Sequence, residues 1–339
     1  MVRLFTNLYI ISNSCSNVTT LLHNPGNNVV EFCAKYGTSY VDITGEKDWS
    51  VQMIEKWENV AKKSGAQIIS FCGHDSIPWD ITASKLTEAM KKECNDDVVK
   101  IECFDEVAGG ISGGTLATIL LSIDGYKAPR FTSDPWIRKA DGSSSKHKTK
   151  VVMPLFPEKV INVGEGKTKW SAPFLMTLIN GEVVKRSNAL RSEGNINVEY
   201  KEGMLLQDFK TAFVNTAGLI FGATALLNPI TRALIEKALP PGQGPTKNAL
   251  ERGYLCVHGL ATGSRGSQVE SAMYFPKDAG YKDTARMVVE SGLCLALDRE
   301  HLPIKNGGFY TPSTGMGDVL LERLCRTGTM FRYRIRSKL

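Results

Sequence analysis

The sequence predicts an α/β fold in which a parallel sheet is followed by a second α/β or α+β domain. At 339 residues the chain is long enough for two domains. From Asn28 onward, helix and strand patterns alternate with short glycine turns, which is typical of a parallel sheet with helical crossovers. We expect residues 1–95 to form the first domain and residues 96–339 the second, with C-terminal elements packing back on the first.

The first domain is predicted from two helix–strand units. A helical stripe ends at Gly37, because glycine adopts the left-handed conformation without a Cβ clash; its apolar members are Val29, Val30, Cys33 and Ala34. Residues 39–43 are a short strand. A second helical stripe closes at Gly65 and consists of Val51, Ile54, Trp57 and Ala61. Residues 66–72 are a nearly continuous apolar run, which is typical of a strand buried on both faces.

The second domain is predicted to mix helices and strands. Its expected helices are a polar one after Asp80 to about Glu93, then 116–123, 172–190, 208–239 and 285–296. Its expected strands are 98–107, two within 252–276, and 331–336 with arginines on the wet face. Residues 125–150 carry seven basic against two acidic residues and predict a long surface loop. At the other end of the chain, residues 1–11 fit a buried strand about as well as a poor signal peptide.

Charge and cysteine usage exclude several classes of protein. The net charge of +6 is modest and concentrated in two segments, so we expect no nucleic-acid partner. The eight cysteines contain no C-x-x-C pair and no Cys/His zinc spacing, so we expect no metal site. Buried free thiols in an intracellular, reducing compartment explain them best.

The strongest candidate site is the polar turn Gly73–Asp80, directly after the buried strand 66–72. Ligands of open α/β sheets bind outside the carboxyl ends of the strands, so Gly73, Asp75 and Ser76 are candidates to contact a ligand. Helix capping is the alternative, since Asp75 or Ser76 could cap a helix that begins near Pro78.

Further candidates follow neighbouring elements. Asp42 and Glu46 end the adjacent strand, so the two polar turns are expected to face one crevice. His74 and Asp75 are the candidate catalytic residues, although a single histidine more often fills space or caps a turn. The turn Ser112, Gly113, Gly114 and Thr115 offers unhindered N–H groups that suit an anionic part of a substrate, with a plain tight turn as the alternative.

The phosphate-binding pattern G-x-G-x-x-G is absent after the first strand. The nearest match, at residues 164–169, is followed by Lys-Trp-Ser-Ala-Pro where a helix should begin, so a polar hairpin turn is predicted there. Residues 211–228 are the most apolar stretch. A core helix is the favoured interpretation, and contact with a membrane or lipid-droplet surface is the alternative.

Seven motifs in order resemble the saccharopine dehydrogenase-like oxidoreductases, which include trans-acting enoyl reductases. They are Gly37–Glu46, Gly73–Asp80, Ser112–Thr115, Val184–Ser187, Gly244–Thr246, Ala279–Tyr281 with Thr284, and Gly307–Pro312. The resemblance implies a Rossmann-type NAD- or NADP-binding domain, a second α/β domain that binds substrate and forms a homodimer, and reduction of a hydrophobic or lipid-linked substrate. It also implies a cytoplasmic, lipid-droplet, mitochondrial or membrane-associated location.

Two departures from the family pattern affect these expectations. His74 stands where the family has Phe. Residues 1–25 do not resemble the family's opening, which carries the glycine-rich phosphate loop, so we expect an incomplete, N-terminally truncated Rossmann-type sheet that binds dinucleotide weakly. The two functional hypotheses are therefore an NAD(P)-dependent reductase and a catalytically impaired, membrane-associated protein that keeps the fold.

Overall fold

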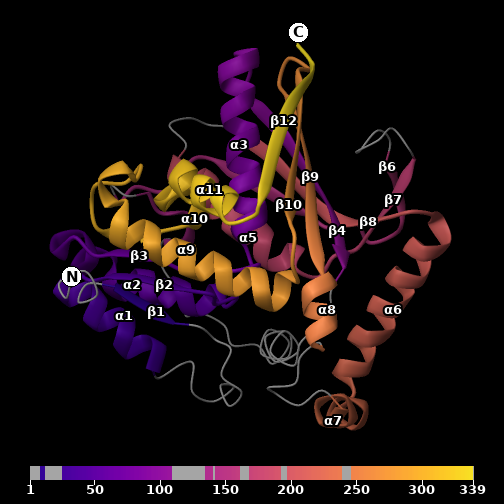
Figure 1. The fold of residues 1–339 in the computed structure, drawn as a ribbon, viewed down its shortest axis with the longest axis horizontal. Coiled ribbons are helices and arrows are strands. Elements are labelled where there is room, and N and C mark those ends of the chain that lie inside the picture. Colours follow the sequence, from indigo (N-terminus) through magenta and orange to yellow (C-terminus); the bar gives the residue numbers. More distant parts are fainter. Residues whose placement is uncertain are drawn as a thin grey trace.

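The computed structural model describes residues 8–11, 25–108, 134–139, 142–160, 168–191, 197–238 and 246–338. They form two sheets with helices packed on them (Figure 1). The turn at 112–115, the predicted helix 116–123 and the residues of the 161–167 and 239–245 connections lie outside the described residues.

The first sheet is parallel and has four strands in the order β1 (Leu8–Ile11), β2 (Ser39–Asp42), β3 (Gln67–Ile69) and β11 (Gly308–Tyr310). Helices α1 (Pro25–Tyr36) and α2 (Lys47–Ser64) pack against each other beside this sheet, and α9 (Thr284–Leu297) contacts β1 and β2. Of the two interpretations that the sequence leaves open for residues 1–11, the structure has a strand at Leu8–Ile11. The glycine at the end of α2, Gly65, has φ of +83°, which explains why the helix stops there.

The second sheet has eight strands. Along its main path the order is β12 (Met330–Ser337), β10 (Gln268–Phe275), β9 (Tyr254–Gly263), β4 (Val98–Ala108), β8 (Asn197–Leu206), β7 (Lys169–Ala172) and β6 (Glu158–Val160). β5 (Lys148–Val152) also pairs with β8. The pairing β4–β8 is parallel and β9–β10–β12 is antiparallel, so this sheet is mixed. β6 and β7 pair antiparallel, as expected for strands on either side of a hairpin, while most of the predicted turn at 164–169 lies outside the described residues.

Helices α3 (Ile77–Cys94) and α5 (Thr177–Arg191) lie on one face of the second sheet, where α3 contacts β9 and β10 and α5 contacts β5 and β8. The main core forms here and continues to the first sheet through Val41, Ile69, Met316 and Leu320. The C-terminal helices α10 (Pro312–Gly315) and α11 (Gly317–Arg326) pack on α3, so residues after 308 contact both sheets. The remaining elements are the short helix α8 (Lys247–Arg252) and single helical turns at Pro135–Ile137, Ala279–Asp283 and Arg299–His301.

Two predictions of local structure, for the helix α3 and for residues 125–150, are wrong. α3 was expected to be a polar helix, yet most of its residues are buried because neighbours cover it on several sides. The surface loop expected at 125–150 instead contains, within its described part, a 3₁₀ turn with the buried Trp136 and the strand β5. Trp136 is held there because its indole N–H donates to the carbonyl oxygen of Glu182 at 2.9 Å.

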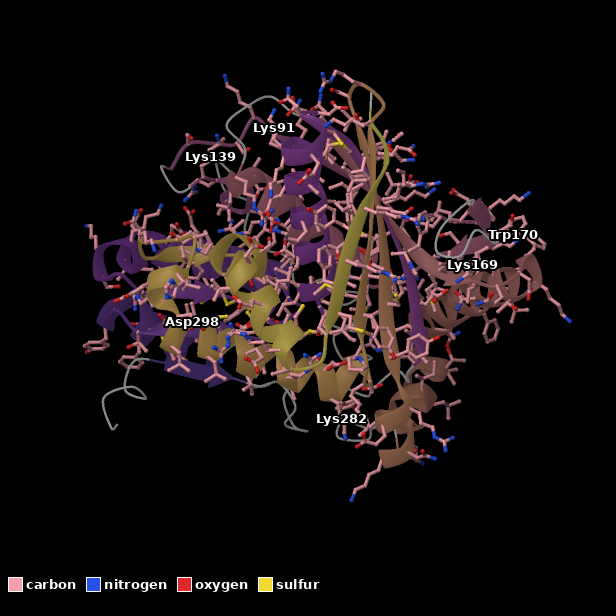
Figure 2. All side chains as sticks on the ribbon, turned by 45° about the horizontal axis from the view of Figure 1, so that its top comes forward. Lys91, Lys139, Lys169, Trp170, Lys282 and Asp298 are labelled. Atoms are coloured by element: carbon pink, nitrogen blue, oxygen red, sulfur yellow. The ribbon has the colours of Figure 1, made fainter. Side chains whose placement is uncertain are left out.

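The prediction of a core helix at 211–228 is also wrong. α6 (Phe209–Leu227) extends away from the body of the molecule and leads into α7 (Pro229–Ala238) (Figure 1). Only Ala212 and Thr216 are buried in α6, whereas Phe221 is 77% exposed. The helix is joined to the sheet at its start, where Phe209 packs edge-on to Trp170, a residue at the outer end of the second sheet in Figure 2. α6 is long and apolar enough to cross a membrane by length and composition.

Candidate functional site

The two polar turns predicted from the sequence lie side by side at the carboxyl edge of the parallel sheet. β2 and β3 are neighbouring parallel strands, so Asp42 and Ser70 follow them at the same edge. The Ser70 hydroxyl donates to Asp42 Oδ2 at 3.2 Å, and the Phe71 N–H donates to Asp42 Oδ1 at 3.4 Å. Phe71 has φ of +64°, so the chain leaves the sheet here and enters the turn.

Asp42 holds these turns together. Its carboxylate is buried and also accepts the Thr44 N–H at 3.1 Å. Burial raises the pKa of Asp42 to about 6, although the hydrogen bonds to Thr44, Tyr40, Ser70 and Phe71 oppose this rise. Because its oxygens bind the protein's own chain, Asp42 positions the turn. Glu46 is half-buried at the start of α2, where its carbonyl oxygen accepts the Ser50 N–H.

Gly73 allows the turn to approach two other segments closely. A Cβ at Gly73 would lie 3.1 Å from Thr284 Cγ2 and 3.2 Å from Ile43 Cγ2. The next residue is fixed by its backbone, since the His74 N–H donates to Thr284 Oγ1 at 3.0 Å. The start of α9 therefore packs directly on the turn, which explains why the Thr284 motif accompanies the Gly73 motif.

The side chain of Ser76 does not cap α3. Ser76 precedes α3, but its side chain makes no cap hydrogen bond, and its fully buried Oγ has no hydrogen-bond partner in the described part of the chain. Asp75 Oδ1 lies 3.0 Å from His74 Nδ1 without hydrogen-bond geometry, and the two side chains are 27% and 16% exposed. The capping alternative for Ser76 is therefore wrong.

The second sheet adds two buried carboxyl groups that the sequence analysis did not identify. The indole N–H of Trp79, in the first turn of α3, donates to Asp105 Oδ1 at 2.9 Å. Glu202 accepts the Asn180 side-chain N–H at 2.8 Å and the Tyr200 hydroxyl at 2.6 Å. Asp105 lies on β4 and Glu202 on β8, and each is completely buried.

These carboxyl groups favour their protonated forms. Burial raises the pKa of Glu202 to about 8 against the opposing hydrogen bonds from Tyr200 and Asn180, and the charge of Asp75 contributes to the rise. Burial followed by the charge of Glu202 raises the pKa of Asp105 well above its ordinary value, while the Trp79 hydrogen bond opposes this.

Several buried polar atoms around Trp79 have no hydrogen-bond partner within the described residues. They are His74 Nε2, Asp75 Oδ1, Ser76 Oγ, Asp105 Oδ2 and Asn180 Oδ1. The ring of His74 packs edge-on to Trp79 at 5.0 Å, which links the turn to the carboxyl pair. Leaving a buried polar atom unpaired costs about 1–3 kcal/mol, so such a group is typical of a site that a ligand or water completes. Nowhere among the described residues do three His, Cys, Asp or Glu side chains group to hold a metal ion.

A second buried network lies behind the turn and is fully connected. Asp80 accepts the Ser187 hydroxyl and the Ser313 N–H, the latter at 2.8 Å, and Ser187 is also hydrogen-bonded to Thr311. These bonds join α3, α5 and α10. Arg186 donates to the carbonyl oxygens of Pro135, Trp136 and Phe309, so it fixes the Pro135–Ile137 turn to β11.

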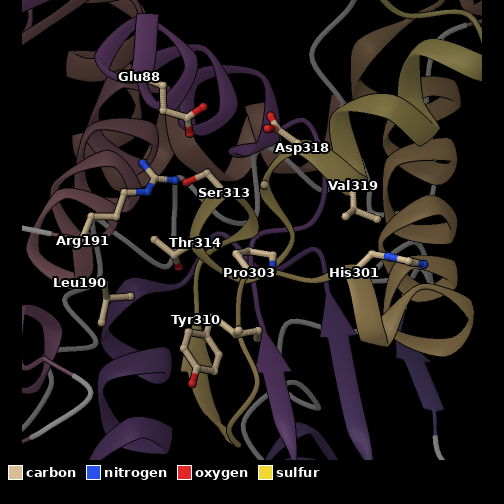
Figure 3. Close-up of a pocket in the computed structure, with 12 residues that line it drawn as sticks. Glu88, Leu190, Arg191, His301, Pro303, Tyr310, Ser313, Thr314, Asp318 and Val319 are labelled. Carbon is tan, nitrogen blue, oxygen red and sulfur yellow. The ribbon is translucent and has the colours of Figure 1, made fainter. Parts of the chain in front are cut away.

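A cavity of about 390 Å³ lies apart from the candidate site, between α3, α5, α10 and α11 (Figure 3). The Arg191 guanidinium points toward Glu88 and Ser313 there, and Tyr310 and His301 lie on its other sides. None of the candidate catalytic, cofactor-binding or substrate-binding residues named from the sequence lines it, although Tyr310 belongs to the motif Gly307–Pro312.

Relatives of this chain were found by sequence comparison. A Mycobacterium tuberculosis relative is 32% identical over 321 residues, which cover 88% of this chain and 75% of the relative. The trans-acting enoyl reductase of Mycobacterium bovis is 31% identical over 325 residues, covering 89% of this chain and 75% of the relative. The chain belongs to the trans-acting enoyl reductase family. The resemblance to saccharopine dehydrogenase-like oxidoreductases, predicted from the motifs, is thereby confirmed.

Other comparisons add less to this family assignment. No family model matches the chain. Saccharopine dehydrogenase from Saccharomyces cerevisiae superposes with a TM-score of 0.46 at 10% identity, covering 92% of this chain and 82% of that one. Homospermidine synthase from Legionella pneumophila superposes with a TM-score of 0.45 at 10% identity, covering 96% and 75%.

Proposed function

We propose that this member of the trans-acting enoyl reductase family is an NAD(P)-dependent reductase of a hydrophobic or lipid-linked substrate. The observation that supports this most is the turn after β3 at the carboxyl edge of the parallel sheet, where His74 Nε2 and Ser76 Oγ are buried without a hydrogen-bond partner among the described residues. Ligands of open α/β sheets bind outside that edge. The name of the relatives indicates an enoyl substrate, that is, a carbon–carbon double bond next to a carbonyl group.

The residues of the turn fit the nicotinamide end of such a cofactor. A carboxamide both donates and accepts hydrogen bonds. The Ser76 Oγ, which has no hydrogen-bond partner among the described residues, and the Asp75 carboxylate, whose Oδ1 lies 3.0 Å from His74 Nδ1, offer complementary groups. Gly73 has no side chain, so a nicotinamide ring could approach its backbone closely. When bound, the reduced nicotinamide supplies a hydride. Residues that would bind the pyrophosphate are not recognisable in the sequence, since it has no G-x-G-x-x-G turn after its first strand.

The protein's own groups would orient the substrate and exclude water. Trp79 and Phe174 pack with ring centroids 5.8 Å apart and form an apolar wall beside the turn. Asp42 keeps the tips of β2 and β3 together, so the turn stays in one position as the substrate binds.

The test is NADPH oxidation with an α,β-unsaturated acyl thioester, measured at saturating NADPH because dinucleotide affinity is expected to be low. The Ser76→Ala and Asp75→Asn variants should raise KM for NADPH or lower kcat. Ser264→Ala is the matched control, because Ser264 bonds Asp96 far from the turn and its loss should leave both constants unchanged. Absence of NADPH oxidation by the wild-type protein across thioesters of several chain lengths would refute the proposal.

A second candidate function is attachment to a membrane or lipid-droplet surface by a catalytically impaired protein. The exposed apolar surface of α6 and α7 favours it, since Phe213, Phe221, Ile230 and Leu234 are each more than half exposed. No charged residue lies between Lys210 and Arg232. Helices of this kind bury their apolar side chains among lipid acyl chains.

Flotation with phosphatidylcholine vesicles tests this candidate. The wild-type protein should float with the vesicles, and Phe213→Ser with Phe221→Ser should leave it at the bottom of the gradient. Phe32→Ser is the matched control because Phe32 is equally exposed on α1, far from α6. Equal flotation of the control and the double variant would contradict the candidate function.

A further inference from the structure

The carboxyl groups of Asp105 and Glu202 are placed where a reductase needs a source of protons. Reduction of a double bond adds a hydride to one carbon and a proton to the next, and the proton must come from the protein or from water. β4 and β8 are parallel with Cys103 opposite Glu202, so Asp105 and Glu202 lie diagonally across the two strands. Both belong to the buried face of the sheet, because side chains alternate along a strand.

Each carboxyl group is held in a fixed orientation. The Trp79 indole N–H fixes one oxygen of Asp105, and Oδ2 has no hydrogen-bond partner among the residues that the structure describes. Tyr200 and Asn180 fix both oxygens of Glu202. Because like charges in a buried site cannot both persist, one carboxyl group of the pair stays protonated at neutral pH.

The pair lies next to the turn through Trp79, which donates to Asp105 and packs edge-on to the His74 ring at 5.0 Å. His74 Nδ1 lies 3.0 Å from Asp75 Oδ1, and the Asp75 side chain is 27% exposed, so the turn joins the buried pair to the surface. The charge of Asp75 also acts on Glu202. The other titratable groups that face the pair are Tyr200 on β8 and Cys103 on β4, whose pKa values burial raises well above their ordinary values. Cys256 on β9 and His74 beside Asp75 complete the set. No lysine or arginine is among the groups whose charges act on Asp105 or Glu202 in the described part of the chain.

We propose that Asp105 and Glu202 form the proton store of the reductase site and that Asp75 delivers the proton to the substrate. This rests on the proposed reductase function. In the step, the charged Asp75 carboxylate takes up a proton from the buried pair, so an O–H bond of the pair breaks and one forms on Asp75. That O–H bond then breaks as a C–H bond forms at the carbon beside the one that receives the hydride. The double bond is reduced, the nicotinamide is oxidised, and the pair is reprotonated from water.

The test compares Asp105→Asn and Glu202→Gln with Glu106→Gln. Glu106 follows Asp105 on β4 but points to the opposite face, where it pairs with Lys169 and His258, so it is the matched control. Turnover should fall by about 10²–10⁴-fold in the first two variants, the usual contribution of acid catalysis, with KM for NADPH unchanged. The alkaline fall in kcat should disappear in Glu202→Gln and persist in the control.

A second measurement does not depend on turnover. The infrared C=O stretching band of a protonated carboxyl group should be present in the wild-type protein at pH 7 and weaken in Asp105→Asn or Glu202→Gln. Wild-type turnover in both variants, or an unchanged infrared band, would overturn the proton store while leaving the reductase function intact. Absence of NADPH oxidation by the wild-type protein would instead refute the function itself, and the proton store with it.

Discussion

Replacement of Glu202 by glutamine should make the protein more stable, although Glu202 accepts two good hydrogen bonds. The wild-type carboxyl group is completely buried, and its pKa is raised from 4.5 to about 8, first by burial. The folded state therefore binds a proton that the unfolded state releases. The protonated Glu202 carboxyl group therefore makes its full contribution to the free energy of unfolding below pH 4.5, and this contribution is lost as the pH rises toward 8.

The magnitude follows from the pKa values. One pKa unit corresponds to about 1.36 kcal/mol, so the wild-type protein loses about 3 kcal/mol of stability by pH 7 and about 5 kcal/mol above pH 8. Glutamine cannot ionise and keeps the size of the side chain. Its amide can accept from Tyr200 or Asn180, although only one of its two polar atoms is an acceptor. Because the variant loses one of the two hydrogen bonds, part of its stabilisation relative to the wild-type protein is cancelled. A net increase of about 2–4 kcal/mol in the free energy of unfolding remains at pH 8.

The assay is urea-induced unfolding of both proteins at several pH values from 4.5 to 9. The difference in free energy of unfolding should be near zero or negative at pH 4.5 and should grow as the pH rises. Glu106→Gln should show the opposite sign, because the hydrogen bond with His258 and the ion pair with Lys169 lower the pKa of Glu106 to about 2. A Glu202→Gln variant that is less stable than the wild type at every pH would refute the reasoning.

Three further predictions follow from individual contacts. Gly73→Ala should destabilise the protein by about 1–3 kcal/mol and lower reductase activity, since its Cβ would force Thr284 and Ile43 aside; an unchanged melting temperature would show that the turn yields freely. Arg186→Lys should cost about 2–3 kcal/mol in chemical denaturation because an ammonium group cannot reach the three carbonyl oxygens of Pro135, Trp136 and Phe309, and a wild-type midpoint would contradict this. Burial lowers the pKa of His258, but hydrogen bonds with Cys256 and Glu106 outweigh this effect and raise the pKa to about 9. The protonated His258 ring should therefore stabilise the folded protein fully below pH 6.5, and this stabilisation should be lost as the pH rises through 9. An NMR titration of the His258 ring with a midpoint near 6.5 would refute this prediction.

The first sheet could be predicted from the sequence because its signals are local. Helix periodicity and terminal glycines placed α1, β2 and α2, and strand tips of a parallel sheet must meet at one edge, which placed Asp42 beside the Gly73 turn. Whether these residues bind a cofactor remains a prediction. The domain boundary at 95/96 also remains one, although α3 packs on the second sheet and β11 completes the first.

The buried carboxyl pair was missed because it depends on long-range pairing. Asp105 and Glu202 become neighbours only through the register of β4 with β8, which no local pattern specifies. The sequence does contain one signal for Asp105. Ile101, Cys103 and Asp105 are two residues apart and therefore share one face of the strand, so an acidic side chain is expected among apolar ones. α6 was assigned to the core because apolar composition does not show whether another element covers a helix.

Hydrogen–deuterium exchange with and without NADPH tests the central claim, that the turns at residues 42–46 and 70–76 form the cofactor end of the site. NADPH at saturating concentration should slow exchange in peptides that cover both turns and leave peptides from α11 unchanged. Protection confined to other segments, such as the cavity beside Arg191, or no protection anywhere, would contradict the claim.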